Sequence, residues 1–330
     1  MAIAVALVLA LAVAGCGGRG PAAGTPATSA APTRWPLTGQ PVGDPERASR
    51  SAVAIKVENV AQARPQAGLN AADLVYEELV EGGLTRLLAL FHAQDAPLVG
   101  PVRSVREVDA PLLRQFGQVL FGYSGGAAAV VREVERNSGA VLVGADRAPA
   151  AYTRRPDRPA PHNLYTSTSA LREAPGDARA GPPGAVFTYA AAVPAGAEPA
   201  AGARLSFSPS ATAAWRWDPQ AGVFLRTEDG TRHVLADGQQ VRADNVVIMA
   251  VRVGRSKVVD VLGNPSPSIE LLGSGDAWLL RDGRVVEGRW SRTSIEEPAR
   301  LTGPDGTPLA LRPGRTWVEL LPAGRAPTFG

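Results

Sequence analysis

The apolar residues after position 50 come in short runs, and Gly or Pro interrupts most of them. The chain holds 36 glycines and 29 prolines among 330 residues, a combined share of about 20% against roughly 12% in average proteins. Asp-Gly pairs, which favour tight turns, begin at residues 229, 237, 282 and 305. Because Gly and Pro end regular elements, this pattern predicts many short strands and excludes a helical bundle.

The first half of the folded part alternates between strand and helix patterns. Ser51–Val57 and Gln118–Tyr123 have the composition of strands, whereas Val105–Phe116 and Ala127–Asn137 have apolar residues at helical spacing. Strands that alternate with helices are typical of βαβ units. The sequence therefore predicts an α/β domain with a mixed sheet over residues 45–200.

Two apolar runs on either side of Gly82-Gly83 predict an antiparallel hairpin over residues 74–91. If this glycine pair forms a two-residue loop, Arg86 lies on the same face as Glu77. Glu78 then points to the opposite face, because successive side chains of a strand alternate. Both faces of the hairpin are largely apolar, which indicates a sheet that is covered on both sides.

After residue 200 the pattern consists of strands alone. Their short length and the turn signals between them predict an all-β domain over residues 201–330. Together with the first half, this gives an α+β fold with an α/β domain followed by an all-β domain. The predicted strands are 204–207, 212–217, 223–227, 245–253, 277–281, 284–290 and 316–321.

The N-terminal residues 1–15 have the features of a lipoprotein signal peptide. Ala2–Gly15 is entirely apolar or Gly, and as a helix it would span about 21 Å, short of the roughly 30 Å of a bilayer core. Small residues precede Cys16, as in a bacterial lipobox. No Lys or Arg precedes Arg19, so either the start lies upstream or the cationic part of the signal is weak.

Cys16 is the only cysteine in the chain, which excludes an intramolecular disulfide, a cysteine-based zinc cluster and a CxxC redox pair. We expect it to carry a diacylglyceryl thioether with acyl chains such as palmitate, because two acyl chains anchor a protein stably. Residues 16–44 are rich in Gly, Ala and Pro and read as a tether. These features predict a lipid-anchored protein of the cell envelope, on the outer face of the bacterial membrane.

The charge pattern gives no support for nucleic-acid binding. The formal net charge is only +3, and Lys56 and Lys257 are the only lysines. The arginines are mixed with acidic residues, and no block of like charges is present. We therefore expect the partners to be the membrane, through the lipid anchor, and a cell-wall polymer or other envelope proteins.

Several motifs resemble those of the YerB-like lipoproteins, a family of unknown function. The resemblance covers nearly all of the chain after residue 40. It implies an envelope lipoprotein with two domains, and it carries over neither a biochemical activity nor a catalytic residue. The motifs are residues 64–69, 72–86, 100–106, Asp109, 124–126, 161–165, 245–247 and 313–318.

Polar residues in the loops and at the strand ends form a candidate ligand-binding surface. Glu78 stands on an apolar face, where burial would raise its pKa unless a cation such as Arg103 or Arg106 lies beside it. A buried Glu–Arg pair that only stabilises the fold is the alternative interpretation. The candidate ligand-binding residues are Glu78, Arg86, Arg103, Ser104, Arg106, Asp109, Ser124, His162 and Asn163.

The segment Gly122–Gly126 matches the G-x-S-x-G pattern of a nucleophile elbow around Ser124. Only 38 residues separate Ser124 from His162, too few for the remaining strands of a hydrolase sheet. The alternative interpretations are a tight turn or an anion site at a helix N-terminus. The enzyme hypothesis that we weigh against a binding role is a cell-wall-modifying hydrolase. It would use Glu78, Arg103, Arg106 and His162.

The three histidines, His92, His162 and His233, lie far apart in the sequence and outside metal-ligand spacing. We expect no metal site and no cofactor. Because no complete catalytic constellation is present, the sequence favours a binding or scaffold role over an enzyme.

Overall fold

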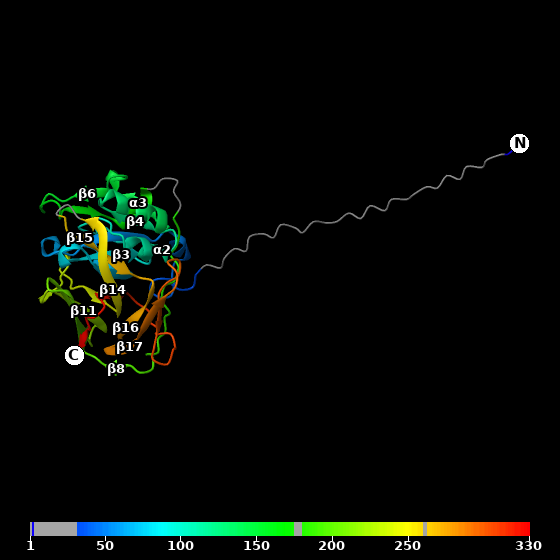
Figure 1. Ribbon diagram of the computed structural model, residues 1–330, viewed down its shortest axis with the longest axis vertical. Helices are drawn as coiled ribbons and strands as arrows, with labels where there is room; N and C mark the ends of the chain where they lie inside the picture. The colour runs from blue at the N-terminus through cyan, green and yellow to red at the C-terminus, as the bar shows by residue number, and fades with distance from the viewer. Residues whose placement is uncertain (1, 3–31, 175–179, 260–262) are drawn as a thin grey trace. The chain divides into compact units, whose positions relative to one another are not determined.

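Strands from both halves of the chain join in one large mixed sheet (Figure 1). The computed structural model describes residue 2 and residues 32–174, 180–259 and 263–330. Pro32–Gly330 is a single compact unit. Apart from Ala2, the predicted signal peptide lies outside the described residues, as do Cys16 and the first part of the predicted tether.

The large sheet has twelve strands, and its main path runs β18-β17-β16-β14-β19-β2-β3-β1-β4-β5, while β15 pairs with β14 and β8 with β17. β1, β4 and β5 are parallel, as the predicted βαβ pattern requires. Its strands are β1 (Val53–Glu58), β2 (Leu74–Leu79), β3 (Thr85–Phe91), β4 (Leu120–Tyr123), β5 (Val141–Gly144), β8 (Glu198–Pro199), β14 (Asn245–Val259), β15 (Pro265–Glu270), β16 (Gly273–Arg281), β17 (Arg284–Arg292), β18 (Arg300–Thr302) and β19 (Thr316–Pro322).

A second sheet of six strands runs β12-β11-β10-β9-β20, with β13 paired to β11. β6 (Tyr152–Arg154) and β7 (Leu164–Thr166) form a separate two-stranded sheet. The six strands are β9 (Gly202–Ser208), β10 (Ala211–Asp218), β11 (Val223–Glu228), β12 (Thr231–Arg232), β13 (Arg242–Ala243) and β20 (Thr328–Phe329).

The helices all belong to the first half of the described chain, and described residues from 180 onward form strands and connections only. The fold is therefore α+β, with an α/β part followed by an all-β part, as the sequence predicts. The α-helices are α1 (Pro45–Ser49), α2 (Asp109–Arg114), α3 (Ala128–Asn137) and α4 (Thr168–Glu173). The short 3₁₀ helices are η1 (Ala61–Ala63), η2 (Leu69–Ala71), η3 (Glu81–Gly83) and η4 (Pro149–Ala151).

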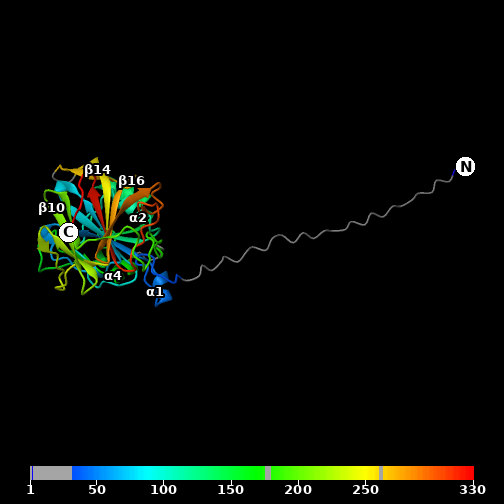
Figure 2. The same ribbon diagram turned by 90° about the horizontal axis from the view of Figure 1, so that it is seen from below.

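Both faces of the large sheet are covered by apolar cores. Val53 and Ile55 of β1 belong to one core, which also contains Trp215 and Phe224 of the six-stranded sheet. Ala54, between them, belongs to the other core, which contains residues of α2 and α3. Figure 2 shows β10 and α2 on opposite sides of β14 and β16. This arrangement explains why the central strands are apolar on both faces.

β19, close to the C-terminus, lies between β14 and β2 and is parallel to both. Thr316 pairs with Leu74 on one side and with Asn245 on the other. The large sheet therefore crosses the predicted boundary near residue 200.

The hairpin of β2 and β3 forms as predicted, but its predicted register is wrong by one residue. Glu78 pairs with Arg86, and Leu79 pairs with Thr85. The turn is longer than two residues, because η3 inserts a 3₁₀ turn in which Gly82 and Gly83 have φ of 69° and 72°. A shift of one residue moves a side chain to the other face, so Arg86 shares a face with Glu78 rather than with Glu77.

The predicted helix over residues 105–116 is shorter in the structure and begins at Asp109. Before it, the backbone amide of Val105 donates to the Gly125 carbonyl at 3.1 Å, and that of Arg103 to the Lys56 carbonyl at 2.9 Å. These contacts keep the segment out of a helix. Pro111 consequently falls in the first turn of α2, where its missing N–H costs no intrahelical bond.

The last part of the predicted tether packs on the folded unit. Leu37 is 0% exposed, Thr38 is 1% exposed and Trp35 is 8% exposed. The Trp35 ring contacts the buried His92 ring edge-on, with centroids 5.0 Å apart. Among the described residues, no helix combines the length and the apolar character that crossing a bilayer requires.

Because β19 joins the two halves within one sheet, we expect residues 32–330 to unfold in one cooperative transition in urea. Tryptophan fluorescence reports mainly on the second half, where five of the six tryptophans lie, and far-UV circular dichroism reports on both. The two transitions should coincide. Separate midpoints for the two signals would show that the halves unfold independently.

Candidate functional site

A pocket of about 560 Å³ lies over the face of the large sheet that carries α2 and α3. Its walls come from the ends of β1, β2 and β3, the loop 103–106, the start of α3 and the β14–β15 hairpin. Figure 1 shows the end of β14 beside β15, on the side of the molecule where α3 and β4 lie. We call this cavity the arginine pocket, because Arg86, Arg103 and Arg106 line it together with Glu58 and Glu81.

Glu58, at the end of β1, connects two predicted residues. Its Oε1 lies 2.8 Å from Arg103 Nε, and its Oε2 lies 2.8 Å from His162 Nδ1. The Glu58 side chain is only 2% exposed. His162 therefore reaches the arginine pocket through Glu58.

Glu81, in the turn between β2 and β3, connects the other side of the arginine pocket. Its Oε2 accepts from Arg106 Nε at 2.9 Å and from Arg106 Nη2 at 2.6 Å. Its Oε1 accepts from the hydroxyl of Ser266 on β15. Burial alone would raise the pKa of Glu81, but the hydrogen bonds from Arg106 and Ser266 hold that pKa below its usual value. Glu81 is thus ionised and neutralises Arg106.

Arg86, on β3, has a different environment from the other two arginines. Its Nη1 donates to the Ser104 carbonyl at 3.1 Å, and among the described residues no carboxylate forms an ion pair with it. The residue is 8% exposed. Burial, together with the charges of Arg106 and Arg103, lowers its pKa to about 10, so it remains a cation at neutral pH.

Lys56 forms a buried triad with Glu78 and Asp109 beneath the arginine pocket. All three side chains are 0% exposed. Lys56 Nζ donates to Glu78 Oε1 and, at 2.7 Å, to Asp109 Oδ1. Burial raises the pKa of Glu78 to about 7, although the charge of Lys56 opposes this rise. The predicted partner of Glu78 was Arg103 or Arg106, and this was wrong: Lys56 is the cation beside it.

The remaining predicted residues support the walls of the arginine pocket or lie outside it. The Ser104 hydroxyl donates to the Ser124 carbonyl at 3.0 Å, and the Ser124 amide donates to the Arg103 carbonyl at 2.9 Å. Ser124 thereby fixes the loop 103–106 through its backbone. Asn163 Oδ1 accepts from Arg154 Nη1 at 2.8 Å, a contact within the loop 154–163. Arg86, Arg103, Ser104 and Arg106 are thus the predicted residues that line the pocket.

Sequence reasoning missed Lys56, Glu58 and the contribution of β15. A signal was available for Lys56, because a lone lysine within an otherwise apolar strand requires a buried acidic partner. Glu58 lies two positions after Lys56 on the same strand, so both side chains point to the same face of the sheet. No comparable signal marks Ser266, because only the tertiary fold brings β15 to the turn between β2 and β3.

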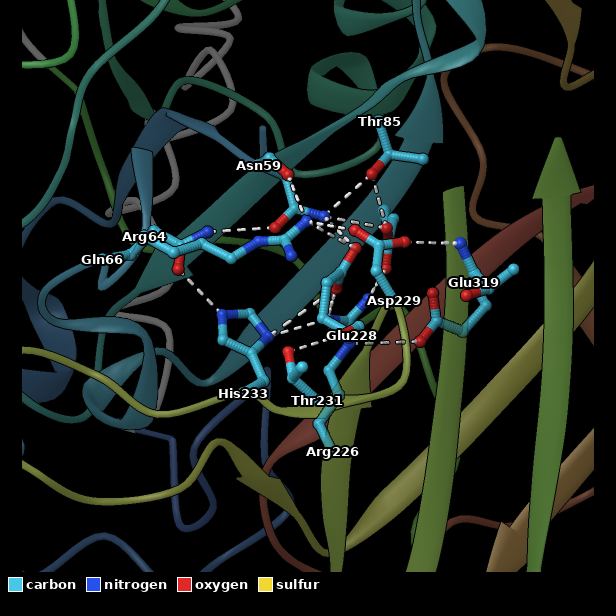
Figure 3. A network of polar contacts seen from close by, with 12 residues as sticks. Asn59, Arg64, Gln66, Thr85, Arg226, Glu228, Asp229, Thr231, His233 and Glu319 are labelled. Atoms are coloured by element: carbon cyan, nitrogen blue, oxygen red, sulfur yellow. Dashed lines mark hydrogen bonds and ion pairs between the residues drawn. The ribbon is translucent and has the colours of Figure 1, made fainter. Parts of the chain in front are cut away.

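A second buried polar cluster lies on the opposite face of the sheet, against the six-stranded sheet (Figure 3). Arg226 of β11 forms ion pairs with Glu77 of β2 and with Glu228. Its Nη1 donates to His233 Nδ1 at 2.7 Å, and His233 Nε2 donates to Gln66 Oε1 at 2.8 Å. Asn59 Nδ2 contacts the Thr85 hydroxyl at 2.8 Å. We call this cluster the Arg226 network.

Protonation states in the Arg226 network follow from burial. Burial, aided by the Arg226 charge, lowers the pKa of His233 well below its usual value. Burial also raises the pKa of Glu319 well above its usual value, as does the neighbouring Glu77 charge. Trp215 Nε1 donates to Glu319 Oε1 at 2.6 Å. Arg226, Glu77 and Glu319 are at most 1% exposed, so this network holds the two sheets together and is closed to ligands.

The arginine-rich loop after residue 146 is bound to the protein itself. Arg147 pairs with Glu135, Arg155 pairs with Asp157, and Arg158 donates to the carbonyls of Gln62, Arg64 and Pro65. Within the described part of the chain, no group of three or more His, Cys, Asp or Glu side chains is placed to hold a metal ion.

Comparison with known proteins gives matches over most of the chain. The model of a "Protein of unknown function (DUF3048) N-terminal domain" matches residues 37–180, and that of its C-terminal domain matches residues 203–318. The curated protein "Putative lipoprotein YerB" of Bacillus subtilis is 29% identical over 300 residues, which cover 87% of this chain and 86% of that protein.

A crystal structure of the YerB protein from Bacillus subtilis superimposes with a TM-score of 0.76 at 26% sequence identity. The match covers 89% of this chain and 99% of that one. The fold described above is therefore similar to that of an experimentally solved relative over most of the chain.

The two lysines allow a direct test of the buried triad. Because Lys56 is 0% exposed and Lys257 is exposed, an amine-reactive ester should acylate Lys257 in the folded protein and leave Lys56 unmodified. Peptide mass spectrometry distinguishes the two sites. Denatured protein, in which both lysines should react, is the control. Comparable labelling of both lysines in the folded protein would contradict the triad.

Proposed function

This chain belongs to the YerB-like family with paired DUF3048 domains, and we propose that it is a lipid-anchored envelope protein that binds a ligand in the arginine pocket. The anchor is Cys16, and the location is the outer face of the bacterial membrane. The partner is a component of the cell envelope, either a wall polymer or another molecule at the membrane. The role is binding rather than catalysis.

Two independent observations support the anchor. The sequence Leu11-Ala12-Val13-Ala14-Gly15 places small residues before the only cysteine, and the curated relative bears the name "Putative lipoprotein YerB". Two acyl chains on Cys16 would hold the protein at the membrane. The residues between Cys16 and the folded unit would keep the arginine pocket within reach of material next to the membrane.

One observation supports binding over catalysis: both carboxylates of the arginine pocket are already paired with cations. Glu81 accepts from Arg106, and Glu58 contacts Arg103 and His162. A general base must be free to take a proton from the substrate. Glu78, which the hydrolase hypothesis requires, is 0% exposed and held by Lys56. The pocket therefore offers positive charge and shape, which suit ligand binding.

The anchor is testable through Cys16. We expect the protein from the native host to carry the lipid modification on Cys16 and to fractionate with the membrane. Cys16→Ala should release the folded unit into the soluble extracytoplasmic fraction, with intact-mass spectrometry confirming the absence of lipid. Equal membrane association of Cys16→Ala and wild type would exclude this anchor.

The binding role is testable with isolated envelope material. We expect the folded unit to be retained on it, and the variant Arg103→Ala/Arg106→Ala to be retained at least several-fold less, because two cations of the arginine pocket are lost. Arg204→Ala/Arg289→Ala, which removes two exposed arginines on strands, is the matched control. Unchanged retention of the pocket variant, with its thermal unfolding intact, would exclude this pocket as the binding site.

A further inference from the structure

The arginine pocket has one more positive than negative side chain in its lining. Arg86, Arg103 and Arg106 face Glu58 and Glu81. Arg103 and Arg106 are each paired with one of these glutamates. Arg86 is the surplus cation, and its contact within the protein is the neutral carbonyl of Ser104. A nearly buried guanidinium beside a cavity is a ready partner for an anion.

Glu78 lies directly across the hairpin from Arg86, but its carboxylate points to a different partner. Lys56 Nζ donates a hydrogen bond to Glu78 Oε1 and another to Asp109 Oδ1. Asp109 Oδ2 accepts from the Arg106 amide at 2.7 Å. Both acids thus lie outside the lining of the pocket, and Arg86, whose charge acts to lower the pKa of the nearby Glu78, forms an ion pair with neither of them. Its remaining donors are left for the cavity.

The start of α3 adds a second donor surface to the same cavity. Gly126 and Ala127 line the arginine pocket directly before α3. Ala127, at the N-cap position, has no side chain that could accept from the first backbone amides. Free amides at the start of a ten-residue helix favour a negative group. These amides and Arg86 both favour an anionic group in the arginine pocket.

Apart from Thr85, Ser104 and Ser266, the rest of the arginine pocket is apolar. Its apolar lining includes two side chains at the mouth that are unusually exposed for their type: Leu84 at 37% and Val259 at 53%. If a small hydrated ion occupied the pocket, these apolar side chains would remain in contact with water. The further apolar residues of the lining are Val60, Val80, Val105, Val130 and Val258.

A neighbouring groove of about 690 Å³ shares Val130 and Val258 with the arginine pocket. Its walls include Ile269 and Leu272, the latter 44% exposed. The charged residues of its lining are Glu107, Glu133, Glu270 and Arg136, and Arg136 pairs with Glu133 while Arg252 pairs with Glu270. The groove lining therefore offers an anion no arginine that lacks an ion pair, unlike Arg86 in the arginine pocket, while an apolar chain fits both cavities.

From these contacts we propose that the ligand is an amphiphile with a single negative charge, whose carboxylate or phosphodiester oxygens bind Arg86 and whose apolar part lies on Leu84, Val130 and Val258. This rests on the proposed function, because it assigns a ligand class to the same pocket. A singly charged oxyanion matches the one surplus cation, and its paired oxygens match the guanidinium fork.

The test uses the folded unit and four probes below their micellar concentrations, with calorimetry at pH 7. Dioctanoyl phosphatidylglycerol carries the anion and the chains, dioctanoylglycerol carries the chains alone, and acetate and inorganic phosphate carry the anion alone. We expect phosphatidylglycerol to bind at least about tenfold more tightly than each of the other probes. Arg86→Met should weaken it by about tenfold or more, the loss expected for a charge-assisted hydrogen bond.

Leu84→Ser and Val259→Ser test the apolar part of the site. Both side chains are exposed, so their replacement leaves the core intact. They should weaken phosphatidylglycerol and leave acetate unchanged. Equal binding of phosphate and phosphatidylglycerol would overturn the apolar part of the proposal. Binding of phosphatidylglycerol that Arg86→Met does not change would overturn the anion site.

The outcome separates this proposal from the proposed function. If the folded unit is retained on envelope material through Arg103 and Arg106 but binds none of the probes, the binding role stands and the ligand class is wrong. If retention is also independent of these arginines, the arginine pocket is not the binding site.

Discussion

Two adjacent carboxylates on one central strand place the strictest demand on this structure. Glu77 and Glu78 are neighbours on β2, and the pleat of the strand turns their side chains to opposite faces of the sheet. Both are at most 1% exposed. A buried charge without a partner costs several kcal/mol, so each face must supply a cation. Arg226 supplies it on one face, and Lys56 supplies it on the other.

The origin of these two cations determines how the chain is assembled. Lys56 comes from β1, two strands away in the same half, whereas Arg226 comes from β11 of the six-stranded sheet. The Glu77 partner can reach β2 only when the second half is docked. β19, next to β2, brings Glu319 to the same network. If the first half folds alone, the buried carboxylate of Glu77 has no cationic partner until the second half docks. The two halves therefore depend on each other for stability.

The sequence predicts most strands of this fold because periodicity and turn residues are local properties. It also predicts that Glu77 and Glu78 face opposite ways, since that follows from strand geometry alone. It fails for the partner of each acid, because pairing depends on the register between strands. The glycines of η3 lengthen the turn and move Arg86 to the face of Glu78. Without that shift, no surplus arginine would reach the pocket.

The two faces of β2 show how similar chemistry serves different ends. In the Arg226 network every cation is enclosed by acids, and the apolar side chains of Trp215 and Trp317 pack against the Arg226 guanidinium. On the other face, Lys56 contacts both Glu78 and Asp109, while Arg86 forms an ion pair with neither and lines a cavity. A buried cation is tolerated there only because water, or a ligand, can reach it. The opening beside Arg86 is thus a physical requirement of its charge, and an anion can bind there without breaking an ion pair of the protein.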